Sequence, residues 1–385
     1  MKPGIYEGIS NAEYHGGEGV SKSGLDLVRR SPLHYKSVRD SANDNEPTPA
    51  QAIGTAAHSI ILEPKEFAKE YCLGLRPQDV PDAIIGRDTL VAMVEKLNEG
   101  RLPKLVTGGS KAEQVDRIMN AQAEMYPAEA HTSKEDLEAL KGAELKEILT
   151  CINNDRLGLI SASGSIPELA DLLRTNGVPV KLWSEAQAEW TANNSHRKVL
   201  SQEQFEQLRG MQAAVMAHPA ARFFLTKANN VVVDLKTTED ASLEGFSKSI
   251  ANWGYDVQHP YYLDGLRLAL EQSDSVPPAE GTAELSAYWN DPITGVLCRC
   301  RPDFWRGQPD HFVFVAVEKK KPYAVGVYVL DADSVASGRA QYREGLDKYA
   351  HCLANDNWPG YGDKVQTISV PAWHLRKNEH LIADQ

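Results

Sequence analysis

A carboxylate and an ammonium group stand two residues apart in the stretch VVVDLKTT, residues 231–238. The apolar residues that begin this stretch predict a buried strand, and side chains two positions apart on a strand face the same side. Asp234 and Lys236 would therefore point together, while Leu235 points into the core. Taken alone, the pattern is typical of a structural ion pair at a strand end, although the same two groups could serve a catalytic site.

Three other motifs place polar groups where chemistry could use them. The segment LCRCRPDFW ends a predicted hairpin strand and carries Asp303, and the segment GTAAH begins a helix of small residues and carries His58. Gln258 and Tyr262 are four residues apart, so they share one face of a predicted helix. Each motif also has an ordinary structural explanation: a turn aspartate, a packed or exposed histidine, and a polar helix face.

Together the motifs form a pattern that is more specific than any one of them. The series G-x-x-x-H, an aspartate at a strand end, D-x-K and Q-x-x-x-Y resembles the PD-(D/E)xK nucleases of the RecB-like type. Residues 1–67 and 186–375 also resemble the exodeoxyribonuclease VIII (RecE-type) family of recombination exonucleases. The segments that carry this resemblance are MKPGIYEGISNAEYH, VSKSGLDLVRRSPLHY, GTAAHSIILEPKEF, YWNDPITGVLCRCRPD, VVVDLKTT and YDVQHPYYLDG.

The resemblance implies a metal site and assigns its ligands. Asp234 and Asp303 would bind Mg²⁺ through their carboxylates. The Leu235 carbonyl and the His58 ring would complete the set. Hard divalent cations prefer oxygen ligands, and neighbouring carboxylates are tolerated when a cation lies between them. The same ligands also suit Mn²⁺.

The resemblance gives the remaining motif residues roles toward the substrate. Lys236 would orient or activate the attacking water and offset charge on the phosphate. Gln258 and Tyr262 would support the site or contact DNA. Thr237 and Thr238 could hydrogen-bond the phosphate or the lysine.

The order of the motifs departs from that of the family. In the family the hairpin that ends in R-P-D precedes the D-x-K strand, whereas here D-x-K is at 234–236 and R-P-D at 301–303. A site depends on geometry rather than on chain order, so the sheet could still assemble. The connections 279–285 and 307–314 would then have to reach across the sheet.

The elements that must position these residues follow from the local patterns. Alternating helices and strands after residue 186 predict an α/β (α+β) class, with a central mixed sheet flanked by helices. A helix that begins near Ser21 should stop at Pro32, and Pro260 should start or kink a turn within a largely helical stretch. The predicted strands are 229–234, 285–289, 296–302, 311–317 and 323–330.

The chain is predicted to consist of an N-terminal part of the nuclease core (1–67), a helical insertion (68–185), and the rest of the core with the motifs (186–385). The insertion contains a weak internal repeat, because 90–102 and 145–157 align at an offset of 55 residues. Each copy predicts a helix, an extended link and a helix, which somewhat resembles the SAP-type module that often binds DNA. Two helical pairs that pack on each other or on a partner protein are an equally good interpretation.

Composition narrows the class of protein. The 385 residues carry a net charge of −12, which argues against a surface coated in basic groups but leaves room for a local basic groove. No apolar run approaches the roughly 18–20 residues that span a bilayer, and the first residues lack the apolar segment of a signal peptide. The five cysteines are scattered and odd in number, which favours reduced thiols in a cytoplasmic protein.

The resemblance implies an exodeoxyribonuclease that needs Mg²⁺ and digests linear double-stranded DNA in the 5′ to 3′ direction. It also implies a homo-oligomeric ring around DNA ends and a single-strand annealing protein as partner, usually in phages. One alternative is a non-catalytic DNA-binding protein that retains the nuclease fold, which the exchanged motif order favours. Another is an endonuclease of the same superfamily, which the similarity at the N-terminus disfavours.

Overall fold

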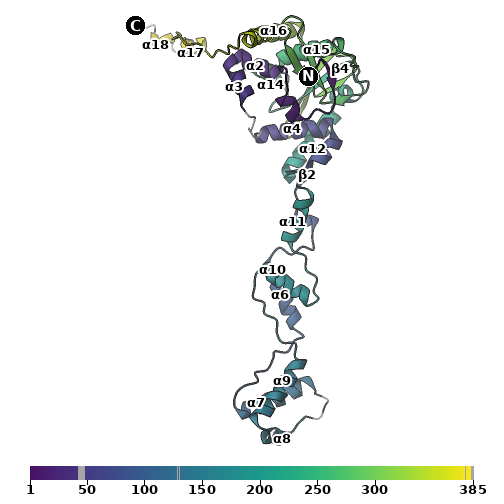
Figure 1. Ribbon diagram of the computed structural model, residues 1–385, viewed down its shortest axis with the longest axis vertical. Helices are drawn as coiled ribbons and strands as arrows, with labels where there is room; N and C mark the ends of the chain where they lie inside the picture. The colour runs from purple at the N-terminus through teal and green to yellow at the C-terminus, as the bar shows by residue number, and fades with distance from the viewer. Residues whose placement is uncertain (42–47, 128, 130, 378, 383–385) are drawn as a thin grey trace. The chain divides into compact units, whose positions relative to one another are not determined.

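The computed structural model describes residues 1–41, 48–127, 129, 131–377 and 379–382. The chain forms two compact units. Unit 1 comprises Met1–Leu73 and Lys198–Gln385, and unit 2 comprises Gly74–Arg197. Unit 2 begins and ends later in the chain than the predicted insertion at 68–185. Helices and mixed sheets occur together, which confirms the predicted α/β (α+β) class (Figure 1).

Unit 1 is built on a five-stranded sheet whose strand order is β10-β9-β4-β8-β5. The central strand β4 pairs in parallel with β9 on one side and antiparallel with β8 on the other. The strands of this sheet are β4 (Val231–Thr238), β5 (Thr282–Ala283), β8 (Phe304–Arg306), β9 (His311–Glu318) and β10 (Val325–Tyr328). Two smaller sheets contain β1 (Gly4–Tyr6), β6 (Ser286–Asn290) and β7 (Leu297–Cys300), and β2 (Tyr71–Leu73) and β3 (Lys198–Leu200).

The exchanged motif order is accommodated at the beginning of β4. The chain leaves β8, passes the first residue of β4 within residues 307–310, and enters β9 on the other side of β4. Asn230, which has a φ of 56°, holds this crossing: its side chain accepts from the Gln308 N–H at 3.0 Å and donates to Asp310 at 3.0 Å. Gly307 has a φ of 66°, and a Cβ there would lie 2.5 Å from the Asn230 side chain. The chain therefore makes the predicted crossing within four residues, in a turn that the Asn230 side chain holds in place.

Two apolar cores cover the opposite faces of this sheet, because neighbouring residues of β4 alternate between them. Val232 belongs to one core, and Val231, Val233 and Leu235 belong to the other. The helices that contribute to the Val232 core are α2 (Lys22–Arg30), α14 (Leu243–Trp253), α15 (Tyr255–Glu271) and α16 (Ala332–Asn355). Those on the opposite face are α4 (Pro49–Leu62), α5 (Pro64–Glu70), α12 (Gln202–Ala217) and α13 (Pro219–Thr226). The remaining helices of unit 1 are α1 (Asn11–Gly16), α3 (Pro32–Asp40), α17 (Ala372–Lys377) and α18 (Glu379–Ile382).

One of the two predictions about proline was confirmed, because α2 ends at Arg30, just before Pro32. Pro32 does not merely stop the first helix: it begins α3, where Ser31 caps the new helix and a missing N–H costs nothing. The other prediction was wrong, because Pro260 lies inside α15, which continues through it. The buried face of α15 outweighs the single hydrogen bond that the proline removes, and the break falls instead at Gly254, whose φ is 63°.

Unit 2 is helical, and its repeat is visible as two small cores. The first copy contributes α6 (Arg87–Asn98) and α7 (Lys111–Met125), and the second contributes α9 (Gly142–Asp155) and α10 (Ile166–Thr175). Helix α7 packs on α9, and α6 packs on α10, so each core takes one helix from each copy (Figure 1). The rest of unit 2 consists of η1 (Pro77–Asp79), α8 (Lys134–Ala139) and α11 (Trp183–Asn193).

Reciprocal hydrogen bonds join the two copies. Asn98 donates to the Ile160 carbonyl and accepts from its N–H, both at 2.9 Å. Asn153 makes the equivalent pair with Leu105, at 2.8 and 2.7 Å. Asn153 and Ile160 follow Asn98 and Leu105 by the repeat offset of 55 residues, so unit 2 is an exchanged pair of helix–link–helix copies. This matches the interpretation in which the helical pairs pack on each other.

Two predictions concern the chain as a whole, namely its membrane-spanning potential and the state of its cysteines. Within the described residues, no helix combines the length and apolarity needed to cross a membrane. All five cysteines lie in described positions and are unpaired, as the prediction of reduced thiols requires.

Candidate functional site

A buried carboxylate lies in the middle of the central strand β4, which continues to Thr238 instead of ending at residue 234 as predicted. Asp234 is fully buried, and its Oδ2 lies 2.6 Å from the Nζ of Lys236. Gln258 on α15 donates from Nε2 to the other carboxylate oxygen at 2.6 Å. The Lys236 ammonium also lies 4.7 Å from the ring centre of Tyr255. The predicted pairing of Asp234 and Lys236 on one face of the strand is therefore present.

The peptide of Leu235 brings the other two motif residues to this point. Strand β8 pairs with β4 only over Val231–Val233, so the backbone of Leu235 lies beyond that pairing. Its N–H donates to the Oδ2 of Asp303 at 2.7 Å, and its carbonyl lies 2.6 Å from the Nε2 of His58. The same His58 nitrogen is 3.3 Å from the Asp303 carboxylate. Although the motif order is reversed, Asp303 therefore still lies against the D-x-K segment of β4.

The orientation of the His58 ring is fixed within its own helix, α4. The other ring nitrogen of His58, Nδ1, lies 2.8 Å from the Gly54 carbonyl one turn earlier, which fixes the orientation of the ring. A Cβ at Gly54 would lie 3.4 Å from the Thr237 hydroxyl, which is an ordinary contact distance, so this part of α4 packs beside β4 without requiring glycine. Both ring nitrogens face carbonyl oxygens, an arrangement that favours the doubly protonated imidazolium.

Burial and mutual attraction shift the pKa of every charged group here. Burial raises the pKa of Asp234 to about 6, against the pull of Lys236. Burial alone would lower the pKa of His58, but the Asp303 carboxylate and its hydrogen bond raise it to about 9. Burial acts upward on Asp303, but His58 and Lys236 lower its pKa below the ordinary value. Desolvation works against the Lys236 ammonium, yet the two aspartates raise its pKa. Two cations and two anions therefore balance at neutral pH.

Glu284 is a fifth charged group at this point, and it was not predicted. It directly precedes the β6–β7 hairpin, and its N–H donates to the Asp303 carbonyl at 3.3 Å. Burial and the neighbouring Asp303 raise the pKa of Glu284 to about 7. Its φ of 54° turns the chain toward the site, and a left-handed conformation at a glutamate has no signature in the sequence.

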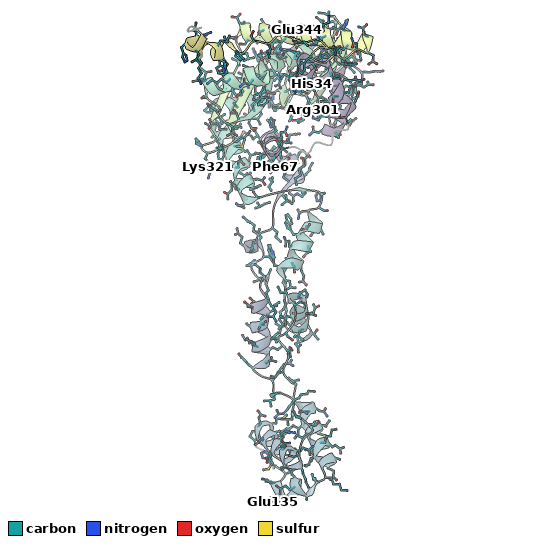
Figure 2. The ribbon with its side chains drawn as sticks, turned by 90° about the vertical axis from the view of Figure 1, so that its left-hand side faces the viewer. His34, Phe67, Glu135, Arg301, Lys321 and Glu344 are labelled. Carbon is teal, nitrogen blue, oxygen red and sulfur yellow. The ribbon has the colours of Figure 1, made fainter. Side chains whose placement is uncertain are left out.

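A polar cavity of about 300 Å³ adjoins these residues. Gln258, Tyr262 and Glu284 line one part of it, and the loop that begins α2 lines another. Lys22 and Arg301 supply its positive charges, and Asp26, which pairs with Lys22 at 2.8 Å, and Glu284 supply carboxyl groups (Figure 2 labels Arg301). Arg301 is held by the Ser286 hydroxyl at 2.8 and 2.9 Å and lies over the Tyr14 ring at 4.1 Å. Groups of this kind suit a phosphate, because a fixed guanidinium and hydroxyls can bind its oxygens.

The residues that were predicted to support the site or to contact DNA differ in what they contact. Gln258 contacts Asp234 directly, whereas Tyr262 lines the cavity and packs on Phe312. Thr237 and Thr238 end β4 in half-buried positions. Thr238 donates to the Asp240 carbonyl at 3.2 Å, so its hydroxyl serves the turn after the strand rather than Lys236.

The donor set fits a hard cation in kind but not in its present arrangement. Two carboxylates and a carbonyl oxygen meet beside the middle of β4, and oxygen ligands of this kind are those that Mg²⁺ or Mn²⁺ prefers. Among the residues that the structure describes, however, no group of three or more His, Cys, Asp or Glu side chains is placed to hold a metal. His58 and Lys236 occupy the oxygens of Leu235 and Asp234 themselves. A cation would have to displace these two positive groups from the ligand atoms.

One comparison with known proteins bears on this site. Residues 305–371 match the model of a family described as a PDDEXK-like domain of unknown function (DUF3799). The match supports the PD-(D/E)xK nuclease superfamily. It covers the end of β8, β9, β10 and α16, whereas His58, Asp234, Lys236 and Asp303 lie outside it. A PDDEXK-like domain indicates a nuclease, and such nucleases generally use divalent metal ions. The comparison with curated proteins gave no match.

Proposed function

We propose that the chain is a Mg²⁺-dependent nuclease that acts on the ends of linear double-stranded DNA, digesting from 5′ to 3′. The observation that carries the proposal is the convergence of Asp303 and His58 on the Leu235 peptide, next to the Asp234–Lys236 pair. These groups come from three segments far apart in the sequence. Buried charges with shifted pKa values beside a polar cavity are typical of an active site.

Each residue would have a distinct task. Asp234 and Asp303, with the Leu235 carbonyl and His58, would hold the cation, which supplies charge for the phosphate and an activated water. Gln258 keeps the Asp234 carboxylate in one orientation through its 2.6 Å hydrogen bond. Lys236 remains charged at neutral pH and would donate to the phosphate oxygen or orient the water.

The cavity beside the site would receive the phosphate backbone. Lys22 and Arg301 lie there in an otherwise acidic chain. A net charge of −12 leaves local positive groups as the means of binding DNA. From the family resemblance we also propose a homo-oligomeric ring and a single-strand annealing partner in phage-type recombination.

One observation favours a second candidate, a DNA-binding protein without nuclease activity. His58 and Lys236 already satisfy the oxygens that a cation would need. If these contacts persist in solution, the fold would bind DNA without cleaving it.

The test is digestion of linear duplex DNA with a 5′-phosphate, labelled at either end, in Mg²⁺, in Mn²⁺ and in EDTA. The expected result is release of 5′-mononucleotides with metal only, and no release by Asp303→Ala. The matched control Asp274→Ala, at an exposed position of unit 1, should retain activity. Cutting of closed circular DNA would indicate an endonuclease instead. A folded parent protein that binds DNA but releases nothing in either metal would support the non-catalytic candidate.

A further inference from the structure

An apolar groove lies on unit 1 between α14, the end of β10 and the beginning of α16. Its volume is about 530 Å³, and Phe246, Ile250 and Leu330 are among the residues that line it. Leu243 and Val329 also line it and are 73% and 68% exposed. Large apolar side chains exposed together mark a surface that another chain can cover.

The charges of this groove have one sign. Three aspartates line it, and no lysine or arginine is among the described residues that line it. Asp331 is the N-cap of α16 and accepts from the Ser334 N–H at 2.7 Å, which lowers its pKa and keeps it ionised. Asp333 is exposed on the first turn of the same helix. An apolar segment that carries positive charges would therefore complement the groove.

The C-terminal segment of the chain has that composition. Trp358 stacks on Tyr35, and Tyr361 accepts from Arg30 at 3.3 Å, so the chain is held to unit 1 up to this point. Every residue from 362 to 381 whose exposure the structure describes is exposed. The exposed apolar residues of this segment are Val365, Ile368, Val370, Trp373, Leu375 and Leu381. Helix α17 places Trp373 and Leu375 beside the cations Arg376 and Lys377.

We propose that α17 of one copy docks into the acidic, apolar groove of a second copy. Trp373 would cover the apolar lining, and Arg376 and Lys377, three and four residues later on the same face of the helix, would face the aspartates. This inference does not depend on the proposed nuclease activity.

The length of α16 favours a second copy over the chain's own groove. The groove lies at the first turn of α16, and the C-terminal segment leaves after its last turn. At about 1.5 Å per residue, this helix separates the two points by roughly 33 Å. The 12 residues from Tyr361 to Trp373 span at most about 40 Å when fully straight. Docking within one chain would need an almost straight path, whereas a neighbouring copy can approach freely.

A charge exchange tests the proposal with the full-length chain. One variant carries Arg376→Glu and Lys377→Glu, and the other carries Asp333→Lys. The mass of each is measured across a range of concentrations by sedimentation, alone and as an equimolar mixture. The wild-type chain should self-associate, and each variant alone should do so about tenfold more weakly. The mixture should associate more strongly than either variant alone, because the unchanged segment of the Asp333→Lys chain meets the unchanged acidic groove of the other variant.

The control is a reversal of the same size on unit 2, Lys134→Glu with Lys146→Glu, at two exposed positions. It should leave self-association unchanged. A wild-type chain that stays monomeric at all concentrations would overturn the proposal, and so would a mixture no stronger than the single variants. Either failure would leave the DNA-digestion test unaffected, whereas a chain that stays monomeric would also overturn the proposed homo-oligomeric ring.

Discussion

The two units of this chain differ in where their carboxyl groups lie and in what shifts the pKa of those groups. In unit 1, Asp234 and Asp291 are buried, and burial is the largest influence on the pKa of each carboxyl group. In unit 2, Arg156 is buried and pairs with Glu124 at 2.5 Å, but the carboxyl groups of Glu113 and Glu168, whose pKa values are lowered, lie on the surface at helix starts. Hydrogen bonds at the helix caps, rather than burial, shift them. Burying a charge is costly unless it is paired, so its presence in unit 1 calls for a functional or packing reason.

The largest expected effect is on the nuclease activity of the site around Asp234 and Lys236 on β4. Lys236→Ala removes the buried cation while keeping the strand, and we expect digestion of DNA to slow by about 10³-fold, or ~4 kcal/mol of barrier. Lys146→Ala, at an exposed position of unit 2, should leave the rate within about twofold, as expected for a position outside the site. Rates are compared under single-turnover conditions with Mg²⁺, beside the melting temperatures. Equal losses in both variants would remove the functional distinction between the units.

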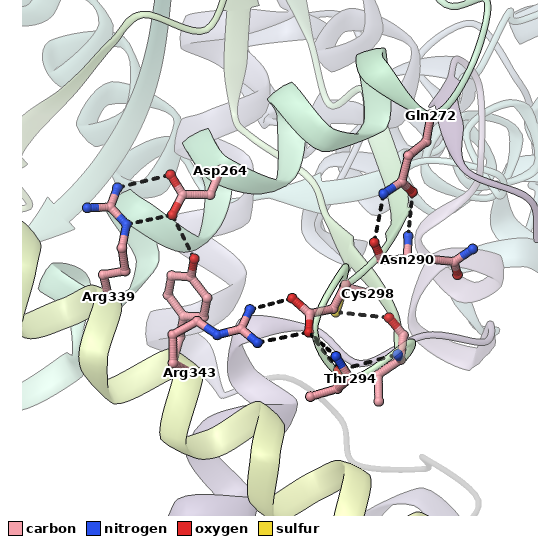
Figure 3. A network of polar contacts seen from close by, with 10 residues as sticks. Asp264, Gln272, Asn290, Thr294, Cys298, Arg339 and Arg343 are labelled. Carbon is pink, nitrogen blue, oxygen red and sulfur yellow. Dashed lines mark hydrogen bonds and ion pairs between the residues drawn. The ribbon is translucent and has the colours of Figure 1, made fainter.

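The next effect separates a buried charge that serves packing from one that serves chemistry. Asp291 joins the β6–β7 hairpin to α16 through two contacts with Arg343, one of them at 2.9 Å, and accepts from Thr294 (Figure 3). Asp291→Asn leaves the Arg343 cation without its partner, so we expect a loss of about 3 kcal/mol of unfolding free energy. Asp347→Asn, exposed on the same helix, should be close to neutral.

The pH dependence of this loss has a defined sign. Burial raises the pKa of Asp291, but the hydrogen bonds from Arg343 and Thr294 outweigh it and hold the pKa below 3.8. The stability from the pair is therefore fully present above the ordinary carboxyl pKa and disappears as the pH falls through the lower folded value. The difference between wild type and Asp291→Asn in urea unfolding should be constant from pH 5 to 8 and shrink below about pH 4. A difference that grows on acidification would contradict the assigned ion pair.

A smaller effect tests the exchanged pairing in unit 2. Asn98→Ala or Asn153→Ala leaves a backbone N–H and a carbonyl of the opposite link without partners, at a cost of about 1–2 kcal/mol each. Hydrogen exchange of the Ile160 amide should report the first variant, and that of the Leu105 amide the second. Asn154→Ala, the exposed neighbour, serves as control. If each variant instead exposed the link of its own copy, the helices would pair within copies.

Much of unit 1 could be predicted because its signals are local. Apolar runs gave β4 and β9 within a few residues, and paired motif spacing pointed to His58, Asp234, Lys236 and Asp303, which the structure brings together. Pro260 shows the limit of local rules, because packing of α15 overrides the preference of one residue. Glu284 shows another limit, since its position depends on a positive φ that glutamate rarely adopts.

The pairing in unit 2 could not be predicted for a different reason. Two similar copies satisfy the same apolar pattern whether each helix packs on its own partner or on that of the other copy. The choice depends on the links, where Asn98 and Asn153 bind the opposite backbone. A repeat in the sequence therefore predicts the helices but leaves their partners open.

The smallest expected effect compares the two copies with each other. Glu113 and Glu168 occupy equivalent cap positions and accept from the N–H groups of Ser110 and Ser165, at 2.8 and 2.7 Å. These backbone hydrogen bonds lower the pKa of both carboxyl groups below 4.5, so their stabilising contribution is present above that pH and is lost below the folded values. Glu113→Gln and Glu168→Gln should each speed hydrogen exchange in the first turn of the affected helix at neutral pH, by similar factors. At a pH below the folded values each variant should match the wild type, because the wild-type carboxyl group is then protonated and neutral, as glutamine is. Unequal effects at neutral pH would mean that the links, rather than the caps, determine the stability of each copy.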